Sequence, residues 1–202
     1  MNVKNLLILS VLKLFLSFSL SAQDSVELFN GHDLSGWTAL PGGEWSVKEG
    51  AIVGQQEKSE KRHGMLLSNE VYSDFELEVI YKSLEGNSGL YFRVDKVKSN
   101  VSVNGFQAEI DSRGNDAGGL YETGGRAWVV RPPAKLLETC YNHKGWNTMK
   151  VIAKGKNIRV YLNGHLTAEL KNDPGRTKGH IGLQLHGSQK MHVIYKSILL
   201  RK

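Results

Sequence analysis

The segment Gly105–Asp116, which reads GFQAEIDSRGND, decides how the chain is interpreted. It starts at a glycine and ends in turn residues, so Phe106–Asp111 is predicted to form a short strand. Side chains alternate between the two faces of a strand, and therefore Ala108 and Ile110 share one face. The opposite face then carries three polar side chains, which are Gln107, Glu109 and Asp111.

Two further segments show the same alternation of apolar and polar residues. They are Gly89–Val94, which reads GLYFRV, and Ile181–His186, which reads IGLQLH. The residues predicted to face the core are Leu90, Phe92, Val94, Ile181, Leu183 and Leu185. If the three strands share one sheet, its other face carries Tyr91, Arg93, Gln107, Glu109, Asp111, Gln184 and His186. A solvated face is usually richer in Lys, Glu and Thr, so this mixture favours a functional face over an ordinary surface.

The rest of the chain predicts an all-β fold with a single domain over residues 23–202. Tyr72–Tyr81 alternates cleanly, and Glu49-Gly50 and Asn163-Gly164 are hairpin signals. The chain has 22 glycines and no run with the period of a helix, which favours a β-sandwich or barrel with at most a helical turn in a loop. Thr123–Glu138 has neither period and is interpreted as a functional loop that carries Trp128, whereas Trp37 and Trp146 are predicted to be structural.

Residues 1–22 are predicted to be a secretory signal peptide rather than part of the fold. An apolar run, interrupted by Lys13, follows a polar start and ends in small residues up to Ala22. The run is shorter than the roughly 20 residues that span a bilayer, so no membrane span is expected after cleavage. The mature protein is therefore expected to be exported, to the periplasm or beyond the cell.

Charge and cysteine content limit the classes of partner. Removal of the predicted signal peptide leaves 24 of the 26 basic residues against 20 acidic ones, and they form no stripe interleaved with aromatic residues. Nucleic acid is therefore not expected as a partner. Cys140 is the only cysteine, which excludes an intramolecular disulfide and a thiolate metal cage, and it is interpreted as a structural thiol.

Glu109 and Asp111 form a pair of carboxylates on one strand face. Positions two apart on a strand are separated by about 6–7 Å, which could serve sugar cleavage by a general acid and a nucleophile. Glu-Ile-Asp also resembles part of the signature of jelly-roll glucanases, but Arg113 and Gly114 stand where a third carboxylate is expected. An ordinary network between Asp111 and an arginine is the alternative.

The remaining candidates supply a base, an anion clamp and stacking surfaces. His186, at the end of its strand, could be a general base or a metal ligand, or else a structural histidine. Arg93 could polarise a carbonyl or pair with Glu109. Tyr121 and Trp128 could stack on the apolar faces of a sugar or could belong to the core of the loop. The other histidines, His63 among them, are interpreted as surface or loop residues.

Ordered motifs along the chain carry a family resemblance. They are LFNGHDLSGW (28–37), WSVKEG (45–50), YSDFEL (72–77), NSGLYFR (87–93), GFQAEI (105–110), GLY (119–121), GWN (145–147) and GHIGLQLHG (179–187). In number and order they resemble the domain of unknown function 1080, the 3-keto-disaccharide hydrolases or 3-keto-glucoside lyase/hydratases, over about residues 26–201. The resemblance implies a concanavalin-like jelly-roll sandwich and export in bacteria. Its matching polar positions are Arg93, Gln107, Glu109 and His186, and a divalent metal ion is left open.

The resemblance implies a carbohydrate substrate with a ketone at C3 of glucose. Such a ketone acidifies the C2 proton, so a base can start an elimination that expels the C1 substituent, after which water adds. His186 or Glu109 would be the base, and Arg93 or a bound cation would hold the oxyanion. Gln107, Asp111, Tyr91, Gln184, Tyr121 and Trp128 would bind the sugar. The alternative is a carbohydrate-binding module without catalysis, because fold does not settle function.

Overall fold

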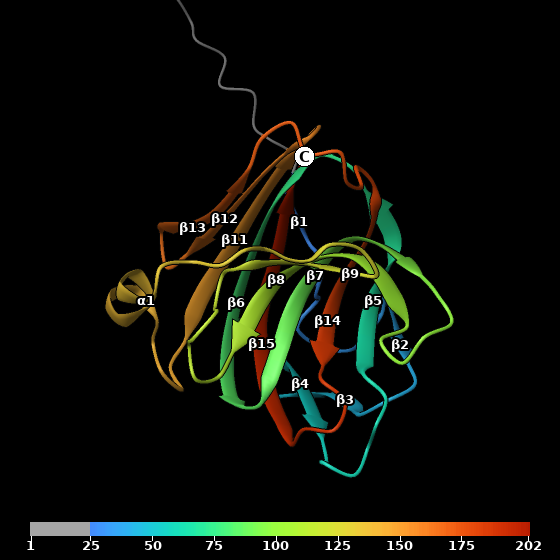
Figure 1. The fold of residues 1–202 in the computed structure, drawn as a ribbon. Coiled ribbons are helices and arrows are strands. Elements are labelled where there is room, and N and C mark those ends of the chain that lie inside the picture. The colour runs from blue at the N-terminus through green and yellow to red at the C-terminus, as the bar shows by residue number, and fades with distance from the viewer. Residues whose placement is uncertain (1–24) are drawn as a thin grey trace, which may run out of the picture.

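The computed structural model describes residues 25–202, so the predicted signal peptide lies outside the described residues. Two antiparallel sheets face each other (Figure 1). One sheet is built from β1 (Ser25–Glu27), β3 (Glu44–Lys48), β4 (Ala51–Gln56), β6 (Phe75–Glu85), β11 (Asn147–Lys154), β12 (Asn157–Leu162), β13 (His165–Leu170) and β15 (Met191–Arg201). The other is built from β2 (Trp37–Leu40), β5 (Gly64–Tyr72), β7 (Asn87–Lys96), β8 (Val103–Asp111), β9 (Leu120–Thr123), β10 (Ala127–Val130) and β14 (Gly179–Leu185).

The strand orders show how the chain alternates between the sheets. The first sheet runs β13-β12-β11-β6-β15-β4-β3, with β1 added against β15, and the second runs β10-β9-β8-β7-β14-β5-β2. Consecutive strands from β4 to β7 therefore alternate between the sheets. β4 and β6 lie in the first sheet, whereas β5 and β7 lie in the second. The pairing of β1 with β15 brings the two ends of the described chain together (Figure 1). The predicted all-β sandwich is confirmed.

The core lies between the sheets and follows the predicted alternation. Phe75, Leu77 and Val79 of β6 are buried, while the residues between them are partly exposed. Burying a large apolar side chain contributes roughly 1.5–3 kcal/mol, so the strands are held chiefly by this shared interior. Cys140 is buried at the edge of the same core.

In the seven-stranded sheet, β8 turns its predicted apolar face toward the core. Phe106, Ala108 and Ile110 belong to the core between the sheets. The register pairs Leu90 with Ala108 and Tyr91 with Gln107, so the core-facing and outward-facing rows of β7 and β8 coincide here. The outward row of β8 supplies Gln107 and Glu109 to a pocket on this face.

A β-bulge in β7 corrects the prediction for the end of this strand. The register with β8 shifts between Phe92 and Asp95, and Arg93 has a left-handed φ of 52°. A bulge inserts an extra residue and so reverses the alternation beyond it. Val94 consequently leaves the core side and packs with Tyr91 and Met65 on the outward face. Simple alternation, which assumes an unbroken ladder, placed Val94 in the core and Arg93 outside, and both placements are wrong.

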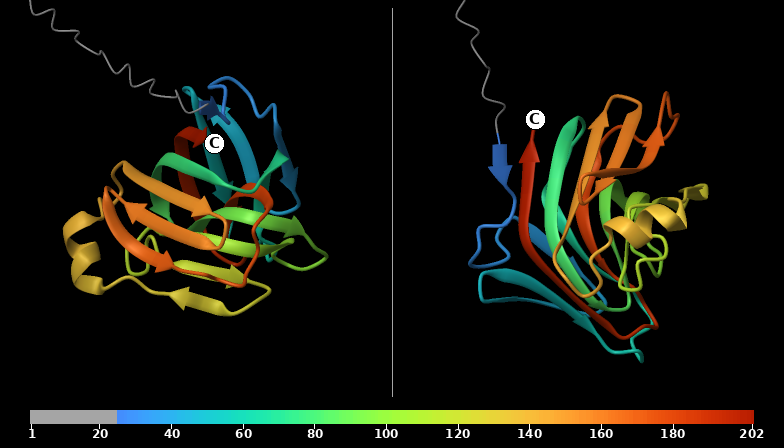
Figure 2. Two further views of the ribbon diagram at one scale, coloured as in Figure 1. Left: turned by 90° about the horizontal axis from the view of Figure 1, so that it is seen from above. Right: turned by 90° about the vertical axis from the view of Figure 1, so that its left-hand side faces the viewer.

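The segment interpreted as a functional loop contains two regular elements. Thr123–Glu138 includes β10, which carries Trp128, and most of α1 (Ala134–Cys140). Both are too short to show a period in the sequence: β10 has four residues and α1 has seven. Helix α1 lies at the edge of the sandwich beside β11–β13 (Figure 2), where the Asn163 side chain donates a 2.6 Å hydrogen bond to the Cys140 carbonyl.

The tryptophans divide differently from the prediction. Trp37 is buried, and its indole N–H donates a 2.7 Å hydrogen bond to the Leu28 carbonyl, as expected for a structural residue. The prediction that Trp146 is structural as well is wrong, because its ring is 41% exposed on the outer face of the eight-stranded sheet. Its place in a turn before β11, rather than within a strand, leaves the ring outside the core. Within residues 25–202 no helix is long and apolar enough to cross a membrane.

Candidate functional site

A pocket of about 440 Å³ lies on the outward face of the seven-stranded sheet. Strands β7, β8, β9, β10 and β14, the loops that adjoin them and the residue just before β5 supply its walls. The lining residues are His63, Asn87, Tyr91, Val101, Gln107, Glu109, Tyr121, Thr123, Gly124, Trp128, Gln184, His186 and Gln189. A volume of this size is typical of small-molecule sites.

Glu109 is the buried acid of the pocket. One carboxylate oxygen accepts a 2.7 Å hydrogen bond from the Gln107 amide, and the other accepts one from the Asn87 amide. Burial raises the pKa of Glu109 from an ordinary 4.5 to about 8, the hydrogen bond from Asn87 opposes the rise, and the nearby Asp111 carboxylate adds to it. At neutral pH the side chain is therefore mostly a neutral acid that can donate a hydrogen bond.

A chain of hydrogen bonds links Tyr91, Gln184 and His63. The Gln184 amide nitrogen lies 3.1 Å from the Tyr91 hydroxyl and 2.9 Å from Nδ1 of His63. Because the amide donates, Nδ1 of His63 accepts, and Nε2 carries the ring proton. Burial lowers the pKa of His63 to about 4, and the neighbouring His186 contributes to the lowering. His63 is therefore neutral at pH 7.

His186 has the opposite arrangement of its ring nitrogens. Its Nδ1 lies 2.7 Å from the Gly187 carbonyl oxygen, which can only accept, so Nδ1 carries the proton. In the neutral ring Nε2 is then free to accept a proton. The main chain of His186 is held from the other sheet, because the Gln56 amide donates a 2.9 Å hydrogen bond to its carbonyl.

Two aromatic residues form the side of the pocket that β9 and β10 supply. The rings of Tyr121 and Trp128 meet edge to face with their centres 5.4 Å apart. The guanidinium of Arg131 lies 3.9 Å from the centre of the Trp128 ring and forms a 2.6 Å ion pair with Asp116. The indole is thus held in place on one side by a cation that is itself anchored.

Most of the residues selected from the sequence line this pocket. They are Glu109, His186, Gln107, Tyr91, Gln184, Tyr121 and Trp128. Asp111 does not, although it lies on the same strand. Its carboxylate accepts a 2.9 Å hydrogen bond from the backbone N–H of Arg113, whose guanidinium lies 3.6 Å away. Asp111 therefore follows the alternative interpretation, an ordinary network between this carboxylate and an arginine.

Arg93 does not join Glu109 and His186, and the prediction that the three converge is wrong. Its buried guanidinium donates 2.7 Å and 2.8 Å hydrogen bonds to the carbonyls of Ser73 and Gly155. It also lies 5.9 Å from the centre of the Phe75 ring, which belongs to the opposite sheet. The β-bulge turns this side chain inward, where it ties a strand to two loops.

The sequence interpretation missed several lining residues, of which His63 and Asn87 bear most on the chemistry. His63 lies in a polar segment whose sequence predicts a surface loop. Counting back by two from Met65, which faces outward beside Tyr91, would have placed His63 on the pocket face. Asn87 begins β7 and is paired with Asp111 in the register, so its position follows only from the turn that precedes it.

The donors in the pocket do not gather around a point as metal ligands do. Across residues 25–202, no group of three or more His, Cys, Asp and Glu side chains is placed to hold a metal ion. His63 and His186 are the two imidazoles that approach each other in this pocket, and their ring centres are 4.3 Å apart.

The fold and the pocket define a class of protein: a jelly-roll β-sandwich with a polar pocket on the outward face of one sheet. The model of the 3-keto-alpha-glucoside-1,2-lyase-like domain matches residues 24–201, and the chain belongs to that family. A search of curated proteins finds no match.

Solved structures support the fold. The chain is similar to the carbohydrate-binding module CBM66 from Bacillus subtilis, with 19% identity, a TM-score of 0.63, and coverage of 83% of this chain and 96% of that one. It is also similar to a candidate glycosyl hydrolase from Parabacteroides distasonis, with 22% identity, a TM-score of 0.64, and coverage of 89% and 99%. A Bacillus subtilis protein of unknown function with a galectin-like fold gives 15% identity, a TM-score of 0.66, and coverage of 83% and 90%. At these identities the likeness is one of fold alone.

Proposed function

We propose that the protein cleaves 3-keto-glucosides by eliminating the C1 substituent and then adding water. Family membership supports the substrate class, because the family is described by a 1,2-lyase acting on 3-keto-alpha-glucosides. The observation that carries the proposal is the pairing, in one pocket, of a carboxyl whose pKa is about 8 with two histidines. One group can donate a hydrogen bond at neutral pH while another accepts a proton, which elimination beside a ketone requires.

His186 is the proposed base. Its free Nε2 takes the C2 proton, and the electrons of the C2–H bond pass into an enolate whose negative charge rests on the C3 oxygen. The enolate collapses to the ketone, forms a double bond between C1 and C2, and expels the C1 oxygen, which takes a proton from solvent while His186 releases the C2 proton to solvent. Water then adds its oxygen to C1 and a proton to C2, so the sum is one glycoside and one water giving 3-keto-glucose and an alcohol.

Glu109 is the proposed donor to the enolate oxygen. A neutral carboxyl buried in the pocket stabilises a developing oxyanion more than water does, because the donor is already in place. Asn87 and Gln107 hold its two oxygens, which fixes the direction of the carboxyl group. Arg93 has no part in this step, since its guanidinium is bound to backbone carbonyls elsewhere.

Trp128 and Tyr121 would bind the apolar face of the sugar, and the amides of Gln107 and Gln184 would bind its hydroxyls. Aromatic rings pack well against the C–H faces of sugars, and amides can both donate and accept. Asp111 is not proposed to touch the substrate. A divalent metal ion remains a separate proposal that a chelator would test.

A carbohydrate-binding module without catalysis is the second candidate. The fold similarity to CBM66 favours it, because that protein is a binding module of nearly the same extent. Binding needs exposed aromatic surface more than a buried acid with a shifted pKa, so Glu109 separates the two candidates.

The decisive experiment is to incubate the purified protein with a 3-keto-α-glucoside, with and without a chelator, and to follow the products by NMR. Catalysis predicts release of the C1 alcohol and 3-keto-glucose, and loss of that release in Glu109→Ala. Binding of the glycoside without any product would support the binding module instead.

A further inference from the structure

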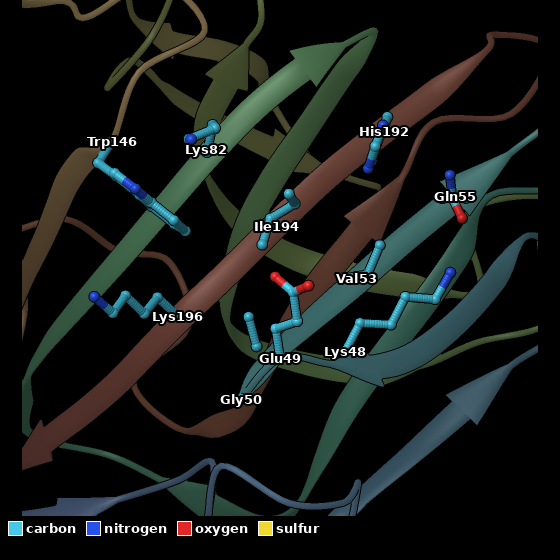
Figure 3. A pocket seen from close by; sticks show the side chains of 11 residues that line it. Lys48, Glu49, Gly50, Val53, Gln55, Lys82, Trp146, His192, Ile194 and Lys196 are labelled. Carbon is cyan, nitrogen blue, oxygen red and sulfur yellow. The ribbon is translucent and has the colours of Figure 1, made fainter.

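A second pocket, of about 570 Å³, lies on the outer face of the eight-stranded sheet (Figure 3). Its floor is aliphatic and consists of Ala51, Val53 and Ile194, from β4 and β15. Trp146 forms one wall, and the Glu49-Gly50 turn between β3 and β4 forms the opposite one. Glu49 and Gly50 both have left-handed φ values, 51° and 71°, so a tight hairpin holds the Glu49 side chain at the pocket.

Two lysines flank the exposed indole. The Lys82 ammonium lies 4.6 Å from the centre of the Trp146 ring and the Lys196 ammonium lies 5.9 Å from it. Figure 3 shows the ring between these two side chains, with Lys48 and Glu49 across the pocket. A lysine against an aromatic face keeps its charge and loses some of its freedom, which leaves it better placed to bind an anion.

The positive charge of this pocket is not balanced locally. Within residues 25–202, Lys48, Lys82 and Lys196 form no ion pair, although several other cations on or beside the same sheet are paired. Lys150 and Arg201 pair with Glu76, and Lys190 pairs with Glu85. Glu49 is the single acidic residue that lines the pocket, so its lining carries an excess of positive charge.

We propose that this pocket binds an anionic oligosaccharide that carries carboxylates, such as a chain of uronic acid residues. The aliphatic floor and the indole suit the C–H faces of sugar rings, and the ammonium groups suit their carboxylates. Gln55, His192 and Glu49 line the pocket and offer hydrogen-bonding groups for hydroxyls. A pocket of this size accommodates about two sugar rings. Because it lies on the other sheet from the Glu109 pocket, the proposal stands without the proposed function.

Digalacturonate is the probe, and its methyl ester is the control, because esterification removes the charge and keeps the sugar skeleton. Calorimetric titration of the whole protein should show binding of digalacturonate and at least about tenfold weaker binding of the ester. The double variant Lys82→Gln/Lys196→Gln should bind digalacturonate at least about tenfold more weakly. Lys154→Gln/Lys178→Gln, which removes the same charge outside the pocket, should bind as the unaltered protein does.

Trp146→Ala tests the indole separately and should also weaken binding of digalacturonate, with an unchanged circular dichroism spectrum. Cleavage of a 3-keto-glucoside, where it is measured, should be unchanged in all of these variants. Absence of digalacturonate binding would overturn the proposal. So would equal binding of the ester, or full retention of binding in Lys82→Gln/Lys196→Gln.

Discussion

The imidazole rings of His63 and His186 lie with their centres 4.3 Å apart at the ends of two paired strands. His63 immediately precedes β5 and His186 immediately follows β14, and the register pairs Gly64 with Leu185. The antiparallel ladder thus brings together two residues that are far apart in the sequence. Their ring nitrogens differ, because His63 accepts from an amide at Nδ1 whereas His186 faces a carbonyl there.

This difference predicts unequal effects of substitution. His186→Ala should lower kcat by about 10²–10⁴, as expected for loss of a general base, with little change in the urea midpoint of unfolding. His63→Gln should be milder, because it removes a neighbour of the base rather than the base. Steady-state kinetics on a 3-keto-glucoside would compare the two variants. A larger loss in His63→Gln than in His186→Ala would contradict the assignment of the base.

The raised pKa of Glu109 predicts how kcat changes at alkaline pH. If its neutral carboxyl donates to the enolate, kcat should fall as the pH rises above about 8, where the carboxyl releases its proton. Glu109→Ala should lower kcat by about 10²–10³. Glu109→Gln keeps a donor, so it should lose less and should show no fall in kcat near pH 8. Persistence of that fall in Glu109→Gln would assign it to another group.

The raised pKa of Glu109 also predicts how the stability of the fold depends on pH. Between its ordinary pKa of 4.5 and the folded value of about 8, the folded chain keeps the proton that the unfolded chain has released. The free energy of unfolding therefore falls as the pH rises through this window, and His63 opposes the trend only below its ordinary pKa of 6.5. From pH 6.5 to 8 the urea midpoint should fall for the unaltered protein and stay nearly constant for Glu109→Gln. Parallel curves for the two proteins would rule out the raised pKa.

Arg93 is predicted to matter for stability alone. Arg93→Met removes the donors to the carbonyls of Ser73 and Gly155, and a buried acceptor left without a partner costs about 1–3 kcal/mol. Urea denaturation should show that loss, while kcat measured well below the new midpoint should be unchanged. Full stability of Arg93→Met combined with a much lower kcat would contradict this prediction and would indicate that Arg93 takes part in the reaction.

Trp128 is predicted to bind rather than to react. Trp128→Ala should raise KM by roughly tenfold, because aromatic contacts of this kind contribute about 0.5–1.5 kcal/mol beyond the area they bury. The kcat should change much less, and Trp37→Phe offers a contrast, since Trp37 lies away from the pocket and should affect stability only. A fall in kcat with constant KM would contradict a binding role for Trp128.

The sequence predicted the residues of this candidate site wherever a strand ladder is regular. Alternation placed Gln107, Glu109 and Gln184 on one face because β8 and β14 pair without interruption at those positions. It failed at Arg93, because a bulge depends on how two strands meet and not on the residue pattern of one. The same limit applies to Trp146, whose position is set by a turn.

Deuterium incorporation at C2 tests the central claim most directly. Elimination removes the C2 proton, so cleavage of a 3-keto-glucoside in heavy water should place deuterium at C2 of the first 3-keto-glucose released, after correction for nonenzymatic exchange. NMR of the product at early times measures this. Full cleavage with a proton retained at C2 would contradict elimination and would indicate direct displacement at C1.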